Sequence, residues 1–204
     1  MILIFDTETS GLPTLAGGRY HLNPKKFNYY DSARIIEIGY ALYKKNERGK
    51  WITVKEVNNL IVPNGFTIDN SHIHGIQHQT CVEEGIDIRN ALSEFADDIK
   101  ACNKIFAYNI NFDVNIVLAE AYRSNHCNMI SAIKEKMDEG KAKCVMELAK
   151  RKMNLTHIKL EPLHKMLFRR DIVQTHRALD DVMLTADVLF EITKKNFEPP
   201  ETDP

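Results

Sequence analysis

The sequence has few cysteines and no long hydrophobic run. Its four cysteines, among 204 residues, include no C-x-x-C pair. We expect no secretory signal, because Met1 leads through a short apolar run directly to an acid. We therefore expect reduced thiols and a cytoplasmic protein rather than a disulfide-stabilised secreted one. No apolar run approaches the roughly 20 residues that a membrane-spanning helix needs, so we expect no membrane among its partners.

An excess of charge of either sign is also absent. The chain has 27 Lys and Arg against 28 Asp and Glu, a net charge of −1. This balance excludes a histone-like protein that coats nucleic acid unspecifically. Residues 134–159 nevertheless contain eight Lys or Arg against four acids. This segment predicts either a local basic surface or simply a solvated helix face.

The order of the hydrophobic patterns predicts an α/β fold. Residues 2–5 form a short apolar run typical of a buried strand, and 34–44 and 51–62 are rich in β-branched and aromatic residues. Apolar residues recur at helical spacing from 87 to 100. The same patterns predict a further strand at 105–107 and helices at 114–121 and about 177–195. Strands that are followed by strand–helix alternation predict one mixed sheet covered by helices.

Two carboxylates follow the first predicted strand directly. Asp6 and Glu8 are two residues apart, so they project from the same face if the strand continues through them. Such a pair repels unless a cation lies between the carboxylates, and oxygen ligands favour Mg²⁺ or Mn²⁺. The pair alone does not establish a site, because 28 of the 204 residues are acids and such pairs arise by chance.

Acids also lie near the start of two predicted helices. Asp113 follows the strand at 105–107, at a position where a carboxylate is equally expected as a simple helix cap. In the last helix, periodicity places Asp181 beside the hydrophobic stripe and Asp180 on the solvent face. A buried acid is costly unless it is paired or binds a metal, so Asp181 is the functional candidate. His176 can face these acids and accept a proton only if it lies in the loop before the helix; the alternative is a structural loop histidine.

In combination these segments resemble the three motifs of the DEDDh exonucleases, the group that contains the proofreading subunit of bacterial replicative polymerases. The motif residues are Asp6-x-Glu8, Asn109-x-x-Phe112-Asp113 and His176-x-x-x-x-Asp181. The resemblance extends to D-T-E-T-S-G-L at 6–12, R-I-I-E-I-G at 34–39, H-G-I at 74–76 and H-R-A-L-D-D at 176–181. In order, these motifs cover most of residues 1–190.

The resemblance implies a ribonuclease-H-like fold, with a mixed five-stranded sheet flanked by helices. It also implies 3′→5′ exonuclease activity that releases nucleoside 5′-monophosphates. By the same resemblance, two divalent cations, Mg²⁺ or Mn²⁺, would be held by Asp6, Glu8, Asp113 and Asp181. His176 would deprotonate the attacking water. The pocket for the terminal nucleotide would be formed by Thr7, Thr9, Gly11, Leu12, His74, Ile76 and Asn109.

The expected substrate is the 3′ end of single-stranded nucleic acid. DNA is favoured, in a proofreading or repair role and with a polymerase as a conceivable partner, while RNA trimming is the alternative. A non-catalytic nucleic-acid-binding module is less favoured, because all four acids and the histidine are present. The exonuclease domain is expected to span 1–195. The tail 196–204 has three prolines and three acids, which predicts disorder.

Two features depart from the family pattern. Tyr108 stands where the proofreading subunits tend to have histidine, which affects substrate contacts rather than the metal ligands. Residues 13–33 are long for a link between the first two strands. Their cations and aromatic residues suit either a strand-binding loop or a packed surface loop; they are Arg19, Tyr20, Lys25, Lys26, Phe27, Tyr29 and Tyr30.

Overall fold

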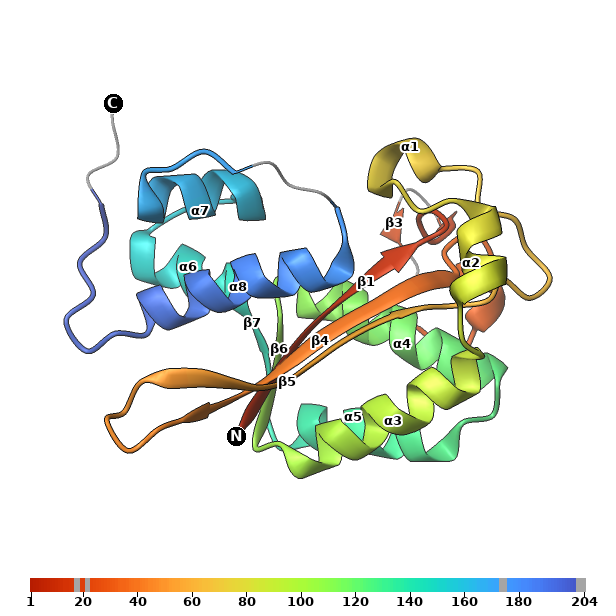
Figure 1. The fold of residues 1–204 in the computed structure, drawn as a ribbon, viewed down its shortest axis with the longest axis horizontal. Helices are drawn as coiled ribbons and strands as arrows, with labels where there is room; N and C mark the ends of the chain where they lie inside the picture. Colours follow the sequence, from red (N-terminus) through yellow and green to blue (C-terminus); the bar gives the residue numbers. More distant parts are fainter. Residues whose placement is uncertain (17–18, 21–22, 173–175, 201–204) are drawn as a thin grey trace.

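A five-stranded sheet forms the centre of the molecule (Figure 1). The computed structural model describes residues 1–204 except 17–18, 21–22, 173–175 and 201–204. The sheet has the strand order β5-β4-β1-β6-β7, in which β1 is antiparallel to β4 and parallel to β6. Its strands are β1 (Ile2–Thr9), β4 (Ile35–Lys45), β5 (Trp51–Leu60), β6 (Lys104–Ala107) and β7 (Ala142–Cys144). The expected mixed five-stranded sheet is therefore confirmed.

Helices cover both faces of this sheet (Figure 1). One face carries α3 (Ile88–Ala101), α4 (Ile110–Arg123) and α5 (Cys127–Asp138). The other face carries α6 (Val145–Met153), α7 (Leu160–Phe168) and α8 (Ala178–Ile192). The short elements are β2 (Leu15–Ala16), β3 (Arg19–Tyr20), η1 (Phe27–Tyr30), α1 (Ser71–His74) and α2 (His78–Glu84).

Strand β1 is buried on both sides, because each helical layer packs against it. Leu3 and Phe5 belong to the core beneath α3 and α4, whereas Ile2 and Ile4 belong to the core beneath α6 and α8. Alternate residues of a strand point to opposite faces, so a continuous apolar run is the pattern expected of a central strand. The strand continues past the predicted residues 2–5 to Thr9, and its polar end stays buried or half-buried.

Gly39 allows α8 to pack directly on the sheet. It pairs with Asp6 across the antiparallel β1–β4 ladder. A Cβ atom built on Gly39 would lie 2.4 Å from the backbone nitrogen of Leu179 and 2.5 Å from the carbonyl carbon of Ala178. The first turn of α8 therefore contacts the backbone of β4, and only glycine leaves room for it.

The segment between β1 and β4 divides into core and surface residues. Tyr30 is a core residue, 2 % exposed, and so it cannot stack on a nucleic-acid base. Phe27 is exposed, and the guanidinium of Arg123 lies 5.3 Å from its ring centre. Part of the expected strand-binding loop, 17–18 and 21–22, lies outside the described residues.

The end of the chain follows α8. Phe197 packs against the core beneath that helix, although the whole tail from 196 is expected to be disordered. Residues 201–204 lie outside the described residues. In the part of the chain that the structure describes, no helix has the length and apolar character needed to cross a membrane.

Candidate active site

Three carboxylates meet where α8 crosses the sheet. Asp6 and Glu8 lie on the same face of β1, as the strand periodicity predicts. Asp181 lies in the first turn of α8, which packs on β1 and β4. One oxygen of each of these three carboxylates lies within 4.8 Å of the others. Asp181 is buried and Asp180 is exposed, so the distinction drawn from helical periodicity is confirmed.

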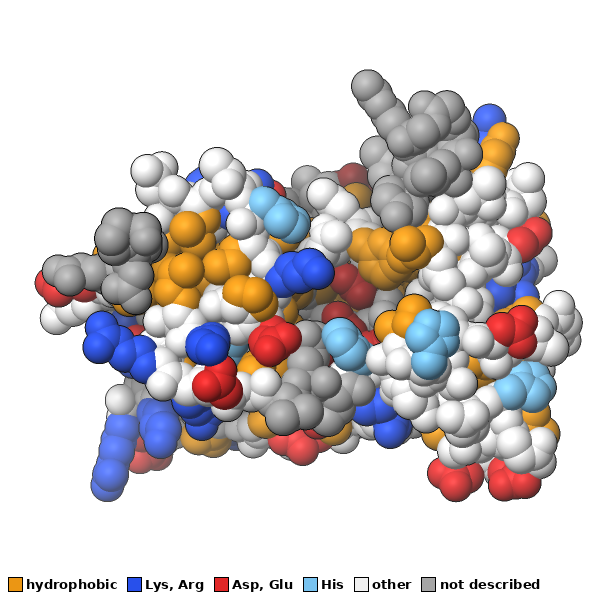
Figure 2. All heavy atoms as spheres, turned by 90° about the horizontal axis from the view of Figure 1, so that it is seen from above, with side chains coloured by type: hydrophobic (Ala, Val, Ile, Leu, Met, Phe, Trp, Pro, Cys, Tyr) orange, Lys and Arg blue, Asp and Glu red, His pale blue; other side chains and the backbone are white. Residues whose placement is uncertain are grey.

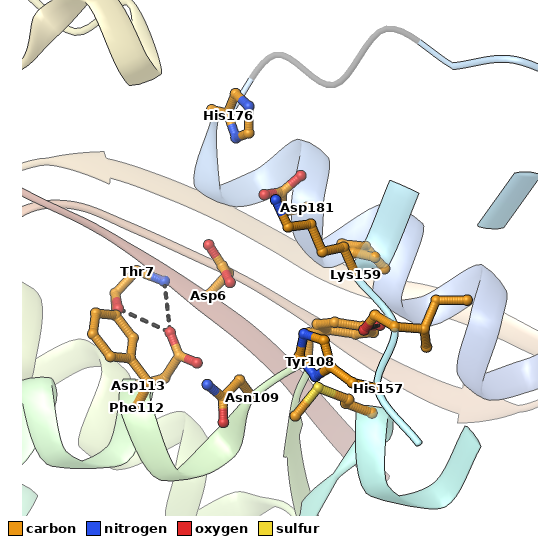
Figure 3. Close-up of a pocket in the computed structure, with 13 residues that line it drawn as sticks. Asp6, Thr7, Tyr108, Asn109, Phe112, Asp113, His157, Lys159, His176 and Asp181 are labelled. Atoms are coloured by element: carbon orange, nitrogen blue, oxygen red, sulfur yellow. Dashed lines mark hydrogen bonds between the residues drawn. The ribbon is translucent and has the colours of Figure 1, made fainter. Parts of the chain in front are cut away.

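Asp113 reaches the same place from the opposite helical layer. It lies in the first turn of α4 and is 3 % exposed. Its Oδ1 accepts hydrogen bonds from the backbone N–H of Thr7, at 3.2 Å, and from the Thr7 hydroxyl, at 2.9 Å (Figure 3). Asn109 is the N-cap residue of α4, and Asp113 in its first turn is held across the site by Thr7. Thr7, which stands between Asp6 and Glu8 in the strand, thus orients Asp113.

Mutual repulsion and burial raise the pKa values of this cluster. Burial is the largest cause of a raised pKa at Asp6, and the charges of Asp113 and Asp181 add to it. Burial also raises the pKa of Glu8 to about 8, with Asp181 as the next contributor. The pKa of Asp113 rises to about 7 by burial, against the lowering effect of its hydrogen bonds from Thr7.

Such a cluster is the donor set that a hard divalent cation requires. The carboxylates are crowded and desolvated, and no described lysine or arginine forms an ion pair with Asp6, Glu8 or Asp113. A divalent cation would neutralise this repulsion with oxygen ligands alone. The residues therefore fit a divalent cation, held by Asp6, Glu8 and Asp181, with Asp113 on the far side of Asp6.

Asp6, Asp113 and Asp181 line a cleft of about 350 Å³. In Figure 2, acidic side chains lie deep in a hollow in the middle of the face shown, with hydrophobic side chains on either side. The opposite wall comes from His157 and Lys159, between α6 and α7, and from Leu160 at the start of α7. Tyr108 also lines the cleft, and its hydroxyl donates to the carbonyl oxygen of Ile158 at 2.7 Å. The tyrosine of the second motif thus fixes this wall.

His176 stands at the opening of the cleft, in the loop immediately before α8 (Figure 3). Its φ angle of 50° lies in the left-handed region, which turns the chain into the helix. The side chain is exposed, and Figure 3 shows it beyond Asp181 on the solvent side. His176 therefore lies in the loop before the helix. This confirms the condition under which it can face the acids.

The expected nucleotide-pocket residues occupy different environments. Asn109 lines the cleft, and Leu12 is 58 % exposed just beyond the end of β1. The Thr9 hydroxyl donates to the carbonyl oxygen of Gly11 at 2.7 Å, which closes the turn after β1. His74 and Ile76 are buried in the neighbouring α1–α2 region and do not line the cleft. The two residues are linked, because Nδ1 of His74 accepts a hydrogen bond from the backbone N–H of Ile76 at 3.1 Å.

Sequence reasoning left two residues of this site out. Lys159 lines the cleft opposite the acids, and the only signal for it was its place in the basic segment 134–159. Glu37, on β4, is completely buried and binds Arg177 at the start of α8. The sequence feature that could have indicated Glu37 is a charged residue inside an otherwise apolar strand, in R-I-I-E-I-G at 34–39.

A mixed sheet of this topology, with clustered carboxylates at the bottom of a cleft, defines a metal-dependent hydrolase. The chain belongs to the RNase T exonuclease family, whose model matches residues 3–189. It is a DEDDh-type 3′–5′ exonuclease with the RNase H-like fold, and it acts on nucleic acid. The family depends on divalent metal.

Solved structures share this fold at low sequence identity. Exonuclease X in complex with 5′-overhanging duplex DNA is 20% identical, with a TM-score of 0.56, over 94% of this chain and 90% of that one. A 3′-exonuclease that recognises the histone mRNA stem-loop is 14% identical, with a TM-score of 0.63, over 97% and 83%. Exonuclease I of E. coli with a dA16 oligonucleotide is 14% identical, with a TM-score of 0.57, over 95% and 41%. Among curated proteins, no sequence is significantly similar to the chain.

Proposed function

We propose that the chain removes nucleotides from the 3′ end of single-stranded DNA and releases nucleoside 5′-monophosphates. The observation that carries this proposal is the meeting of Asp6, Glu8 and Asp181 within 4.8 Å, beside an open cleft that Asp6 and Asp181 line. An open cleft admits a single strand end. Support for DNA comes from exonuclease X and exonuclease I, which were solved with DNA; the histone mRNA exonuclease supports RNA.

The proposed mechanism uses two divalent cations, Mg²⁺ or Mn²⁺. When bound, such a pair activates a water molecule and stabilises the oxygen that leaves the phosphorus. Asp6, Glu8 and Asp181 would hold one ion, and Asp113, together with Asp6, would hold the other. Four carboxylates supply a charge of about −4, which offsets the charge of two divalent cations.

His176 is the proposed general base. Its place at the opening of the cleft allows a ring nitrogen to take a proton from the attacking water and pass it to solvent. The terminal nucleotide would lie against Thr7, Thr9, Gly11, Leu12 and Asn109. His74 and Ile76 would support this pocket from beneath, since Asn70, next to α1, donates to the carbonyl oxygen of Thr9 at 3.1 Å.

We place this activity in the cytoplasm, in DNA repair or proofreading, with a polymerase as partner. The four cysteines are all free, which is consistent with a reducing compartment. The mismatched substrate in the experiment below tests the proofreading role.

The experiment offers 5′-labelled single-stranded DNA, duplex, mismatched duplex and RNA, each with Mg²⁺ or Mn²⁺. We expect a ladder that shortens from the 3′ end of single-stranded DNA and of the mismatched duplex. A ladder on RNA alone would replace the proposal with RNA trimming. Asp6→Ala should abolish turnover and leave the fold intact by circular dichroism; unchanged hydrolysis would refute the ligand assignment.

A further inference from the structure

A second cavity lies at the opposite end of β1 from the carboxylates. Its volume is about 930 Å³, against about 350 Å³ for the acidic cleft. Ile2 lines it, and four residues of extended strand, about 13 Å, separate Ile2 from Asp6. Figure 1 shows the N-terminus at this end of β1, away from the arrowhead. We call this cavity the basic groove, because six lysines line it: Lys45, Lys50, Lys104, Lys143, Lys194 and Lys195.

The positive charge of the basic groove is largely uncompensated. None of the described residues that line it is Asp or Glu, although acids slightly outnumber Lys and Arg in the whole chain. Lys194, which follows α8, pairs with Glu191 of that helix at 2.6 Å. Lys50, Lys104 and Lys143 form no ion pair with any described residue. Unpaired lysines that converge on one cavity attract a polyanion.

The floor of the basic groove is aromatic. Trp51 and Phe190 stack with their ring centres 5.2 Å apart and an angle of 12° between the rings. The ammonium group of Lys45 lies 5.2 Å from the centre of the Trp51 ring. Both rings are only partly buried. A groove that places lysines around partly exposed rings therefore offers contacts for both phosphates and flat bases.

These two properties select one kind of occupant. An acidic peptide would pair with the lysines, but its carboxylates do not stack on the aromatic rings of Trp51 and Phe190. A duplex would satisfy the lysines with phosphates, but its bases are stacked inside the helix. A single strand exposes both phosphates and bases, which is the combination that lysines and aromatic rings bind together.

We propose that the basic groove is a second, non-catalytic binding site for single-stranded nucleic acid. It would hold a part of the polymer remote from the 3′ end that is being hydrolysed; this role rests on the proposed function, whereas strand binding itself does not. Two linked contacts raise the effective concentration of the 3′ end at the cleft. Long strands would thus be bound more tightly than dinucleotides and would stay bound between successive cleavages.

The only tryptophan of the chain provides the readout, because it lies in the basic groove. With EDTA present, which prevents hydrolysis, oligo(dT) of about 15 nucleotides should change Trp51 fluorescence saturably. A thymidine dinucleotide, which fills the acidic cleft alone, should leave it unchanged. Polyglutamate is the competing polyanion, and a tighter response to polyglutamate than to oligo(dT) would overturn the nucleic-acid assignment.

Charge removal tests the same inference by a second route. The double variant Lys104→Gln/Lys143→Gln should weaken oligo(dT) binding about 10-fold, and lower the slope of log affinity against log salt by roughly 1.4. It should raise KM for the long strand and leave kcat and KM for the dinucleotide unchanged. The matched control is Lys100→Gln/Lys134→Gln, which removes the same charge from α3 and α5 on the other face of the sheet.

The two proposals can fail separately. If long strands are bound and hydrolysed while Trp51 fluorescence stays constant, the basic groove is not a binding site, although the exonuclease stands. If oligo(dT) changes Trp51 fluorescence but no substrate is hydrolysed with metal, the groove stands and the proposed function falls. An equal effect of both double variants on binding would also overturn the inference.

Discussion

The carboxylate of Glu37, in the middle of the sheet, binds both the side chain of Arg177 and the first backbone N–H of α8. Arg177 Nε donates to the two carboxylate oxygens at 3.0 and 3.1 Å, and its Nη2 also donates. The N–H of Ala178 donates at 2.8 Å, and Asn58 Nδ2 donates at 3.0 Å. The start of α8 is thereby tied to β4. Because His176 precedes Arg177 and Asp181 follows in the same turn, this link sets the position of two proposed catalytic groups.

Glu37→Gln should therefore lower kcat more than it raises KM. The amide replaces an acceptor oxygen with a donor, which weakens charged hydrogen bonds worth about 1.5–3 kcal/mol each. We expect kcat to fall about 10-fold, from misplacement of His176 and Asp181. The measurement is steady-state hydrolysis of an oligonucleotide at saturating Mn²⁺, with thermal unfolding in parallel.

Glu120→Gln is the matched control for Glu37→Gln. Glu120 is also buried and pairs with an arginine, Arg34, at 2.5 Å, but it lies on α4 away from the cleft. We expect a similar loss of stability with kcat nearly unchanged. If both variants lower kcat in proportion to the stability they lose, Glu37 is merely a structural residue.

Sequence periodicity correctly predicted those features of the site that are determined within a single strand or helix. Strand alternation placed Asp6 and Glu8 on one face, and helical periodicity separated Asp181 from Asp180. The partners of Glu37 could not be predicted in this way, because Arg177 and Ala178 are about 140 residues away. A buried charge in a strand signals that a partner exists, but only the tertiary packing of α8 identifies it.

The wall of the cleft was unpredictable for a different reason. Residues 157–159 lie between α6 and α7, in a segment without the hydrophobic periodicity that identifies an element. Their position depends on the hydrogen bond from Tyr108, the residue after β6, to Ile158. The short helices α1 and α2 likewise carry too few residues for a periodic signal.

The metal-free protein should lose stability as the pH rises. The pKa of Glu8 is raised to about 8 in the folded chain, against an ordinary value of 4.5, and that of Asp113 is raised to about 7. A folded carboxyl with a raised pKa stabilises the protein fully below the ordinary pKa and loses this effect as the pH passes the folded value. In EDTA, the melting temperature should therefore fall between about pH 5 and about pH 8.

Added Mn²⁺ should reverse this trend, because it binds the ionised carboxylates. We expect the increase in melting temperature on adding Mn²⁺ to be larger at about pH 8 than at about pH 5. Glu8→Gln removes one titrating group, so it should flatten the pH dependence in EDTA. An unchanged slope in this variant would show that other groups cause the loss.

Substitution of His176 should slow the chemical step. A proton acceptor in this role contributes about 10²–10⁴-fold, so His176→Asn should lower kcat by that factor. Asparagine tolerates the left-handed backbone that His176 adopts at a φ of 50°, so the loop should keep its course. Single-turnover hydrolysis with a 5′-labelled strand measures the effect, and a rate within about threefold of the native protein would exclude the proposed base.

Lys159 should bind a substrate phosphate from the wall facing the acids. Figure 3 shows its side chain directed across the cleft towards Asp181. Lys159→Gln removes a charge-assisted contact, so KM should rise about 10-fold while kcat changes little. Lys152→Gln, an exposed lysine of α6 outside the cleft, is the control. The same rise in KM in both variants would point to a general effect of net charge.

Gly39→Ala should disturb catalysis through the backbone alone. The added methyl would overlap the first turn of α8, at 2.4 Å from the nitrogen of Leu179, so the helix must move away from β4. Overpacking of this kind costs about 1–3 kcal/mol of stability. The same shift carries Asp181 away from Asp6 and Glu8, so the Mn²⁺ concentration for half-maximal activity should rise. Ala41→Val, in the same strand and buried in the core beneath α8, is the control for overpacking at a neighbouring position. If its metal requirement rises as much, the close contact at Gly39 is not what holds the carboxylates together.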